Sequence, residues 1–200
     1  MKKIFVTVIC IALYKFSFSQ IDKGYWLVGG NAGFESYNST YTTSLNNTSS
    51  KQTNISFSPK IGYFFVKKIA AGLNPKFTYG HYNPTGSSTA VSSSSYSFGI
   101  GPFFRYYFLN DEKQYNILFD ANYTIGKIVS PNDTKITGKN NEVSLLIGPE
   151  IYFNSSAAIE ILLGYKNSIQ SLDNPNLVFT EKRNGLFMSI GFILHLIKEN

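Results

Sequence analysis

Few residue types in this chain of 200 residues are suited to catalysis or metal binding. The sequence contains two histidines, His81 and His195, and one cysteine, Cys10. A single cysteine excludes a disulfide framework and any zinc or iron–sulfur site built on several cysteines. Asp133 and Asp173 are isolated acids without the spacing of a calcium loop, and no glycine-rich phosphate loop precedes a helical pattern. We therefore expect no cofactor and no metal.

One histidine has neighbours that would allow nucleophilic or lipid-hydrolysing chemistry. His81 precedes a serine-rich stretch and could meet Ser95 or Asp133. The simpler interpretation is a histidine at a membrane interface beside Tyr79 and Tyr82. The other histidine is expected at the opposite end of the fold, so the two cannot share one site. We expect that the protein is not an enzyme.

Eight further ionisable residues occur one or two at a time within otherwise apolar or small-residue segments. They are four acids and four bases, namely Glu35, Lys60, Lys76, Arg105, Asp120, Glu150, Glu160 and Lys166. If they share one interior they should pair, because a buried and unpaired charge is strongly unfavourable. The pattern predicts a salt-bridge network that fills a lumen, and the alternative is a weak ion pathway lined by the same groups.

The first residues are typical of a secretory signal peptide. Lys2 and Lys3 precede an apolar run from Ile4 to Tyr14, and Ser17 and Ser19 offer a cleavage site for signal peptidase. The run is shorter than the ~20 residues that span a bilayer. We expect cleavage of residues 1–19, which leaves residues 20–200 as one domain. The net charge then falls from +6 to +3 with Lys2, Lys3 and Lys15, and this charge excludes a nucleic-acid partner.

The rest of the chain alternates between apolar and small or polar residues with a period of two, the signal of β-strands. Eight segments follow this pattern: 26–35, 54–65, 71–79, 97–108, 115–125, 143–153, 159–166 and 186–196. Their lengths suit strands that cross a membrane, which need about 9–11 residues. We predict an all-β fold, an eight-stranded antiparallel up-and-down transmembrane barrel.

The connections between these segments alternate in length. Short ones lie at Lys67-Lys68, 110–114 and 154–156, and long ones rich in Ser, Thr and Asn lie at about 38–53, 81–96, 127–142 and 167–184. Short turns at one end and long loops at the other are typical of bacterial outer-membrane barrels. We expect the long loops to face the cell exterior.

Aromatic residues indicate which face meets lipid. They gather where the segments reach the short turns, as expected for a girdle at the periplasmic interface, formed by Tyr25, Trp26, Tyr63, Phe65, Tyr106, Phe108, Tyr115 and Phe153. The opposite face carries too few charges for contact with water. The apolar face is therefore expected to point outward, into hydrocarbon. Four prolines fall on this face, and we predict β-bulges at Pro59, Pro75, Pro102 and Pro149.

Three stretches of this sequence resemble the outer membrane protein A-type β-barrel family in its compact eight-stranded form. They are 58–65 with 69–73, 101–108 and 148–153. The resemblance implies a bacterial outer-membrane location, with outer-membrane lipid, lipopolysaccharide and the assembly machinery as partners. The chain ends at Asn200, so we expect no peptidoglycan-binding domain, and the terminal aromatic that the assembly machinery usually reads is absent, leaving Phe192 or Leu196 in its place.

The function expected from these features is structural or adhesive. The barrel would be the anchor, and the long extracellular loops would recognise a ligand that the sequence does not identify. A narrow pore for small solutes is the alternative, and a barrel enzyme acting on lipid is a third class.

Overall fold

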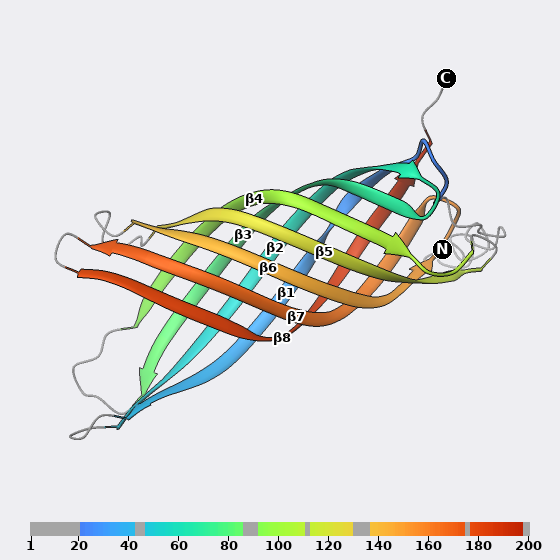
Figure 1. Ribbon diagram of the computed structural model, residues 1–200. Coiled ribbons are helices and arrows are strands. Elements are labelled where there is room, and N and C mark those ends of the chain that lie inside the picture. The colour runs from blue at the N-terminus through green and yellow to red at the C-terminus, as the bar shows by residue number, and fades with distance from the viewer. Residues whose placement is uncertain are drawn as a thin grey trace, which may run out of the picture.

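The computed structural model describes residues 21–42, 47–85, 92–110, 113–129, 137–174 and 177–197. The expected signal peptide, Cys10 and Asp133 lie outside these residues. The described chain forms a closed barrel in which each strand pairs antiparallel with the next and β8 returns to β1 (Figure 1). The strands are β1 (Trp26–Thr42), β2 (Asn47–Val66), β3 (Ile69–Thr85), β4 (Ser93–Tyr107), β5 (Tyr115–Val129), β6 (Thr137–Tyr152), β7 (Ala157–Asn174) and β8 (Leu177–Leu196). The predicted fold class is confirmed.

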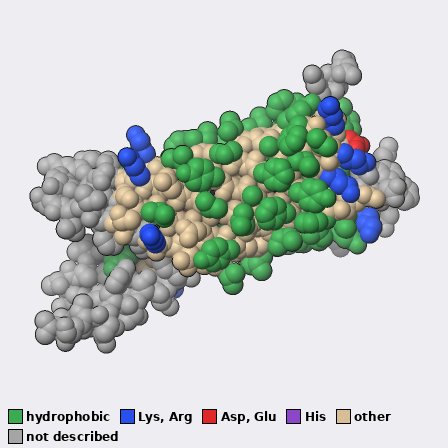
Figure 2. Space-filling model, in the orientation of Figure 1, with side chains coloured by type: hydrophobic (Ala, Val, Ile, Leu, Met, Phe, Trp, Pro, Cys, Tyr) green, Lys and Arg blue, Asp and Glu red, His purple; other side chains and the backbone are tan. Residues whose placement is uncertain are grey.

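The period-two pattern separates an apolar exterior from a polar interior. Ile147 and Leu163 are 50% and 55% exposed on the outside, whereas Lys60 and Glu150 are 4% and 0% exposed. Figure 2 shows hydrophobic side chains covering the middle of the barrel, with lysine and arginine side chains toward its two ends. A band of this kind is suited to hydrocarbon, because water would leave so much apolar surface unfavourably exposed. Among the described residues, no helix is long and apolar enough to cross a membrane.

The strands are longer than the sequence pattern indicates. They contain 15 to 20 residues, because most of the polar stretches expected as long loops continue the ladders. Ser39 still pairs with Ser50, and Lys139 with Ser171. The expectation of four long loops was therefore wrong. Where a barrel rises above hydrocarbon both faces of a strand meet water, so the hydrophobic alternation that identifies the strand disappears.

The predicted β-bulges at the four prolines are also wrong. Each proline pairs regularly with one neighbouring strand. The ladder to its other neighbour is interrupted there but resumes in the same register. The cause is that the amide of a residue points to one neighbouring strand only, and proline has no amide hydrogen to donate to it. Pro102, for example, pairs regularly with Leu73 of β3, whereas β4 and β5 are unpaired between Ile100 and Phe103 and resume in the same register. The register shift in the β2–β3 ladder lies elsewhere, between Phe64 and Val66 beside the turn.

An apolar cluster closes the end of the lumen near the short turns. Ile21 is fully buried there with Leu27, Phe64 and Ile193. The segment before β1 is held across this end by backbone hydrogen bonds, from Lys68 N to the Ile21 carbonyl at 2.8 Å and from Gly24 N to the Phe64 carbonyl at 2.9 Å. The floor of the barrel is therefore packed rather than open.

Most of the expected aromatic girdle faces outward near this end. Trp26, Phe65, Phe108, Tyr115 and Phe153 are each between 41% and 48% exposed, and Tyr63 and Tyr106 are half-buried. Rings pair along the surface, with centroids 5.3 Å apart for Trp26–Tyr63 and 5.0 Å apart for Tyr106–Phe108. Tyr25 differs, because it precedes β1 and packs against the interior apolar cluster.

Candidate functional site: the charged lumen

The eight ionisable residues singled out in the sequence all point into the lumen, in two layers. The lower layer, here called the Arg105 cluster, contains Lys60, Arg105, Asp120, Glu150 and Glu160 with His195. The upper layer, here called the Glu142 layer, contains Glu35, Lys76, Glu142 and Lys166. Alternation places these residues inside, because every second side chain of a strand faces the axis. An eight-stranded barrel is narrow enough for such side chains to meet across it.

Arg105 lies at the centre of its cluster and is fully buried. Its Nη1 and Nη2 donate to Glu160 at 2.7 and 3.1 Å, and its Nε donates to Asp120 Oδ2 at 2.8 Å. Nη1 also lies 3.4 Å from Glu150 Oε2. One planar guanidinium thus connects carboxylates from β5, β6 and β7, a geometry that a lysine cannot reproduce.

Two groups complete the pairing of Asp120. Lys60 from β2 lies 2.7 Å from Asp120 Oδ2, and Asn122 donates to the other carboxylate oxygen. Asn31 from β1 donates to Glu160 Oε1 at 2.5 Å. The cluster is therefore linked by hydrogen bonds to strands on all sides of the barrel. Such bonds offset the cost of removing the charges from water.

His195 is the member of the cluster that sequence analysis missed. Its Nε2 lies 2.7 Å from Glu150 Oε1, and the Tyr107 hydroxyl donates to Glu150 Oε2 at 3.0 Å. Its ring is fully buried, with ring centroids of Phe64, Tyr107 and Tyr152 at 5.6 to 6.0 Å. The cluster thus holds three carboxylates, from Asp120, Glu150 and Glu160, with the basic side chains of Lys60 and Arg105 beside His195. The sequence did contain a signal for it, because His195 follows the alternation of β8 that places every second side chain in the lumen.

The Glu142 layer lies on the side of the cluster away from the short turns. Lys76 and Lys166 pair with Glu142 and Glu35 respectively, and Lys166 Nζ also lies 4.0 Å from Glu142 Oε2. The Phe187 ring lies close to both amines, with its centroid 5.8 Å from Lys76 Nζ and 4.8 Å from Lys166 Nζ. Glu142 was expected in a loop, but it is buried on β6.

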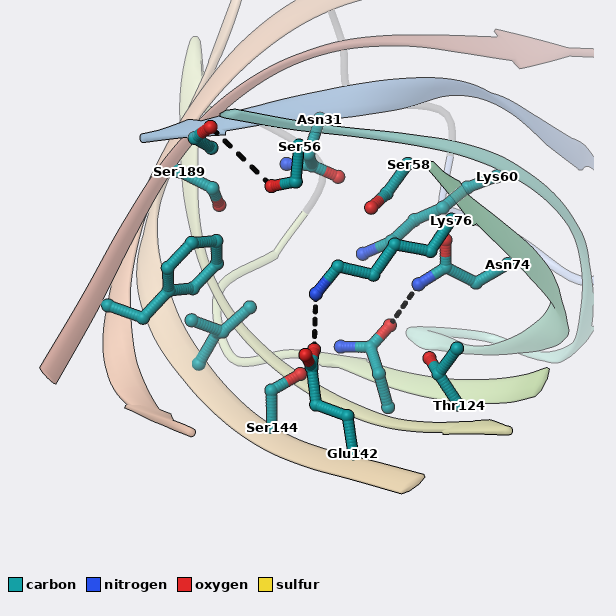
Figure 3. A pocket seen from close by; sticks show the side chains of 14 residues that line it. Asn31, Ser56, Ser58, Lys60, Asn74, Lys76, Thr124, Glu142, Ser144 and Ser189 are labelled. Carbon is teal, nitrogen blue, oxygen red and sulfur yellow. Dashed lines mark hydrogen bonds and ion pairs between the residues drawn. The ribbon is translucent and has the colours of Figure 1, made fainter. Parts of the chain in front are cut away.

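A small cavity separates the two layers (Figure 3). It measures about 30 Å³ and is lined by polar side chains that include Asn31, Ser58 and Ser189, with Lys60 below and Lys76 above. This volume is enough for water but not for a hydrated ion or a solute. Among the described residues, the two charged layers therefore leave no wide passage along the axis.

A larger cavity, here called the vestibule, opens above the Glu142 layer. It measures about 890 Å³, and Phe187 lies between it and the small cavity. Its polar lining includes Thr78, Ser97 and Gln170, and Arg183 of β8 reaches it from the wall. Arg183 was expected in a loop, and the structure instead places it in a strand.

The histidines do not form a catalytic arrangement. His81 Nδ1 lies 3.2 Å from the hydroxyl of Ser94, the residue before the expected Ser95, and His81 belongs to the half of β3 away from the short turns. His195 contacts the acid Glu150 at the other end of the lumen. In the described part of the chain, no group of histidine, cysteine and acidic residues could hold a metal ion.

Comparison with known proteins gives structural neighbours only. No family model and no curated protein matches the chain. It is similar to the crystal structure of the outer membrane protein OprG from Pseudomonas aeruginosa, with a TM-score of 0.53 and 12% identity over 90% of this chain and 100% of that chain. Neisserial surface protein A is a further neighbour, with a TM-score of 0.47 and 14% identity over 86% of this chain and 97% of that chain. The similarity to OprG shows that this chain shares the barrel fold of that protein.

Proposed function

We propose that this protein is a structural or adhesive protein of a bacterial outer membrane, anchored by a barrel that does not conduct solutes. The observation that carries the proposal is the Arg105 cluster, in which one buried guanidinium connects Asp120, Glu150 and Glu160 across the lumen. The packed apolar cluster beneath it supports the same conclusion. A through pore would need both layers to open.

The outer-membrane location is part of the proposal. It is supported by the apolar exterior, by the aromatic residues near the short turns and by the fold shared with OprG. The chain would be exported with residues 1–19 removed, inserted by the outer-membrane assembly machinery and surrounded by outer-membrane lipid and lipopolysaccharide.

The adhesive role would belong to the strand ends that rise above the membrane. The first hairpin extends from Phe34 paired with Ile55 up to Thr42 paired with Asn47, and its upper part is rich in Ser, Thr and Asn. The backbone pairing carries this Ser-, Thr- and Asn-rich sequence beyond the apolar band, and this supports assigning contact with another surface to it.

Conductance in a planar lipid bilayer tests the anchor against the narrow pore. We expect the refolded barrel to give no steady current, and an Arg105→Ala variant to give at most irregular openings, because the apolar floor remains. Uniform long-lived channels in the unmodified protein would support the pore and contradict the anchor.

A shortened hairpin tests the adhesive role. Replacing residues 40–49 by Asn-Gly leaves Ser39 opposite Ser50 and joins them by a two-residue turn, so the membrane part of the barrel is kept. Cells that display the full chain should adhere to abiotic and protein-coated surfaces more than cells that display this variant at equal surface level. Equal adhesion would assign the protein a purely structural role.

A further inference from the structure

The outer face of β2, β3 and β4 changes from apolar to basic over three successive rows of paired residues. The first row is apolar and aromatic, the second carries hydroxyl and imidazole groups, and the third carries a lysine. The rows are Ile55, Tyr79 and Tyr96, then Thr53, His81 and Ser94, then Lys51 opposite Asn83. They follow one another on the outward side, because residues two apart on a strand share a face. A polar surface therefore begins here where the apolar band ends.

Aromatic pairs mark where hydrocarbon ends on this face. Tyr79 and Tyr96 are 38% and 54% exposed, with ring centroids 5.3 Å apart. The adjoining row toward the short turns contains Phe77 and Phe98, with centroids 5.1 Å apart. Tyrosine is enriched at the level of the headgroups because its ring is amphipathic. The two polar rows beyond the tyrosines therefore lie at the level of the headgroups.

The second row offers hydrogen-bond donors. Ser94 Oγ lies 3.1 Å from the Tyr79 hydroxyl and 3.2 Å from His81 Nδ1. When Ser94 accepts from Tyr79 and donates to Nδ1, the proton of neutral His81 is on Nε2, which is then a donor. Thr53 lies opposite His81 in the β2–β3 ladder, so its side chain neighbours the imidazole. This row can therefore donate to an acceptor on the outer surface.

Lys51 supplies a positive charge in a part of the chain without acids. It is exposed, and among the described residues it takes part in no ion pair. The sequence contains no aspartate or glutamate between Glu35 and Asp111, a range that includes β2, β3, β4 and the segments that join them. Glu35 faces the lumen and pairs with Lys166. The next strands with acids, β5 and β8, lie at least two ladders from β2, roughly 10 Å or more.

We propose that this surface, here called the Lys51 face, binds the phosphate group of an outer-leaflet lipid. Lys51 would pair with the phosphate, and His81 Nε2 and the Thr53 hydroxyl would donate hydrogen bonds to its oxygens. Diagonal positions across a ladder are about 7–8 Å apart, so a lysine side chain can reach a group bound at His81. An ionised phosphate is an acceptor, and it is therefore the complement of a cation with two donors. The proposal rests on the proposed outer-membrane location, which supplies headgroups at this end of the barrel.

A lipid is favoured over dissolved phosphate by the apolar surface next to the donors. Ile55, Phe57, Phe77 and Phe98 are each between 48% and 55% exposed, and they continue the outer face toward the short turns. Acyl chains attached to the bound phosphate would lie against these side chains. One exposed lysine contributes little to an ion pair in water. A phosphate that is carried by a membrane lipid is instead held near the surface at high effective concentration.

Three variants separate this site from general attraction to the barrel. Lys51→Gln removes the charge, Lys51→Arg keeps it, and His81→Phe removes the Nε2 donor. Lys139→Gln is the matched control, because Lys139 is also exposed and outward-facing but lies on β6. Every substituted side chain is exposed or half-buried, so each variant should fold. Heat-dependent mobility in a detergent gel checks this.

The test uses native mass spectrometry of the full chain in detergent micelles, titrated with diphosphoryl lipid A, the lipid anchor of lipopolysaccharide. We expect saturable binding of one lipid per chain, and about tenfold weaker binding of lipid A from which both phosphates have been removed. Lys51→Gln should weaken binding about tenfold and His81→Phe about threefold, whereas Lys51→Arg and Lys139→Gln should stay within about twofold of the unmodified protein. Inorganic phosphate at millimolar concentration should not displace the lipid.

Three results would overturn the proposal. If both forms of lipid A bind alike, the bound lipid is only the layer that surrounds the barrel. If Lys139→Gln weakens binding as much as Lys51→Gln, the attraction is general to the outer wall. If millimolar inorganic phosphate displaces the lipid, the site takes a dissolved anion. Membrane fractionation of cells measures the location separately, so a chain found in the outer membrane whose Lys51 face does not select phosphate would contradict this site and leave the proposed location intact.

Discussion

Pro59 of β2 and Pro75 of β3 lie opposite each other, because the pairs on either side, Phe57 with Phe77 and Ile61 with Leu73, share one register. Neither proline has an amide hydrogen to donate, and the ladder is open over the three positions between those pairs. The outer neighbours are intact, with Gly30 paired to Pro59 and Ile100 paired to Pro75. The two missing donors therefore fall in the same ladder, between β2 and β3, and the ladders to β1 and β4 stay continuous at these prolines.

The double variant Pro59→Thr, Pro75→Thr should close this part of the ladder. Each threonine supplies the missing amide, and a net hydrogen bond contributes about 0.5–1.5 kcal/mol. The amides introduced at positions 59 and 75 point into this ladder and should be protected from hydrogen exchange, and the free energy of unfolding in lipid vesicles should rise. The single variant Pro59→Thr is the control, because Pro75 still withholds its donor. Rapid exchange of both introduced amides in the double variant would mean that something other than the missing donors keeps the strands apart.

Arg105→Met should destabilise the barrel strongly. The change leaves the buried carboxylates of Asp120, Glu150 and Glu160 without their shared partner, and breaking a buried ion pair costs about 3–5 kcal/mol. Urea unfolding in lipid vesicles measures this loss. Lys139→Met, at an outward-facing position of β6, should change stability by less than about 0.5 kcal/mol. Comparable effects at the two positions would show that the cluster does not stabilise the fold.

His195→Phe should destabilise the barrel moderately. Phenylalanine preserves the packing against Phe64 and Tyr107 but removes the contact with Glu150, and an unsatisfied buried polar group costs about 1–3 kcal/mol. The measurement is the unfolding midpoint in urea. His81→Phe, which removes only a contact with a serine hydroxyl, should leave that midpoint nearly unchanged. A larger loss at position 81 would contradict this account.

The sequence predicts which residues face the lumen better than it predicts their partners. Successive side chains of a strand point to opposite faces, so the inward direction of Lys60, Asp120 and Glu160 was identifiable from their own segments. Their partners depend on how far neighbouring strands are staggered around a closed barrel, which no single segment encodes. His195 meets Glu150, on a strand that it does not pair with, only because the lumen is narrow.

The remaining errors share one physical cause. The alternation signal exists only where one face of a strand meets hydrocarbon, so Glu142 and Arg183, which lie beyond that band, were interpreted as loop residues. The end of the β1–β8 pairing at Gly33 and Ser189 was also outside the reach of the sequence. β1 and β8 are joined by closure of the barrel rather than by a turn, and turns are what fix register between consecutive strands.

Ile147→Arg tests the orientation of the apolar face. Ile147 lies between Phe119 of β5 and Leu163 of β7 in the apolar band and faces outward. An arginine near the midplane of the membrane costs about 2–4 kcal/mol, so insertion and unfolding free energy should both fall. Ser93→Arg, at the exposed start of β4 and away from the short turns, should be neutral. Equal tolerance of both changes would count against hydrocarbon as the surroundings of the band.

Cysteine pairs across β1 and β8 test whether the pairing of these strands ends at Gly33 and Ser189, in a chain with Cys10 changed to Ser. Ala32 pairs with Ile190 within the paired part, and paired strands bring Cα atoms about 4.5–5.5 Å apart, a separation that a disulfide spans. Ala32→Cys with Ile190→Cys should therefore oxidise readily. If the ladder continued, Phe34 would lie opposite Met188, so Phe34→Cys with Met188→Cys reports on whether it does. We expect this second pair to stay reduced under the same oxidant, as judged by gel mobility after thiol labelling. Rapid and complete oxidation of the second pair would show that β1 and β8 remain side by side beyond Gly33 and Ser189.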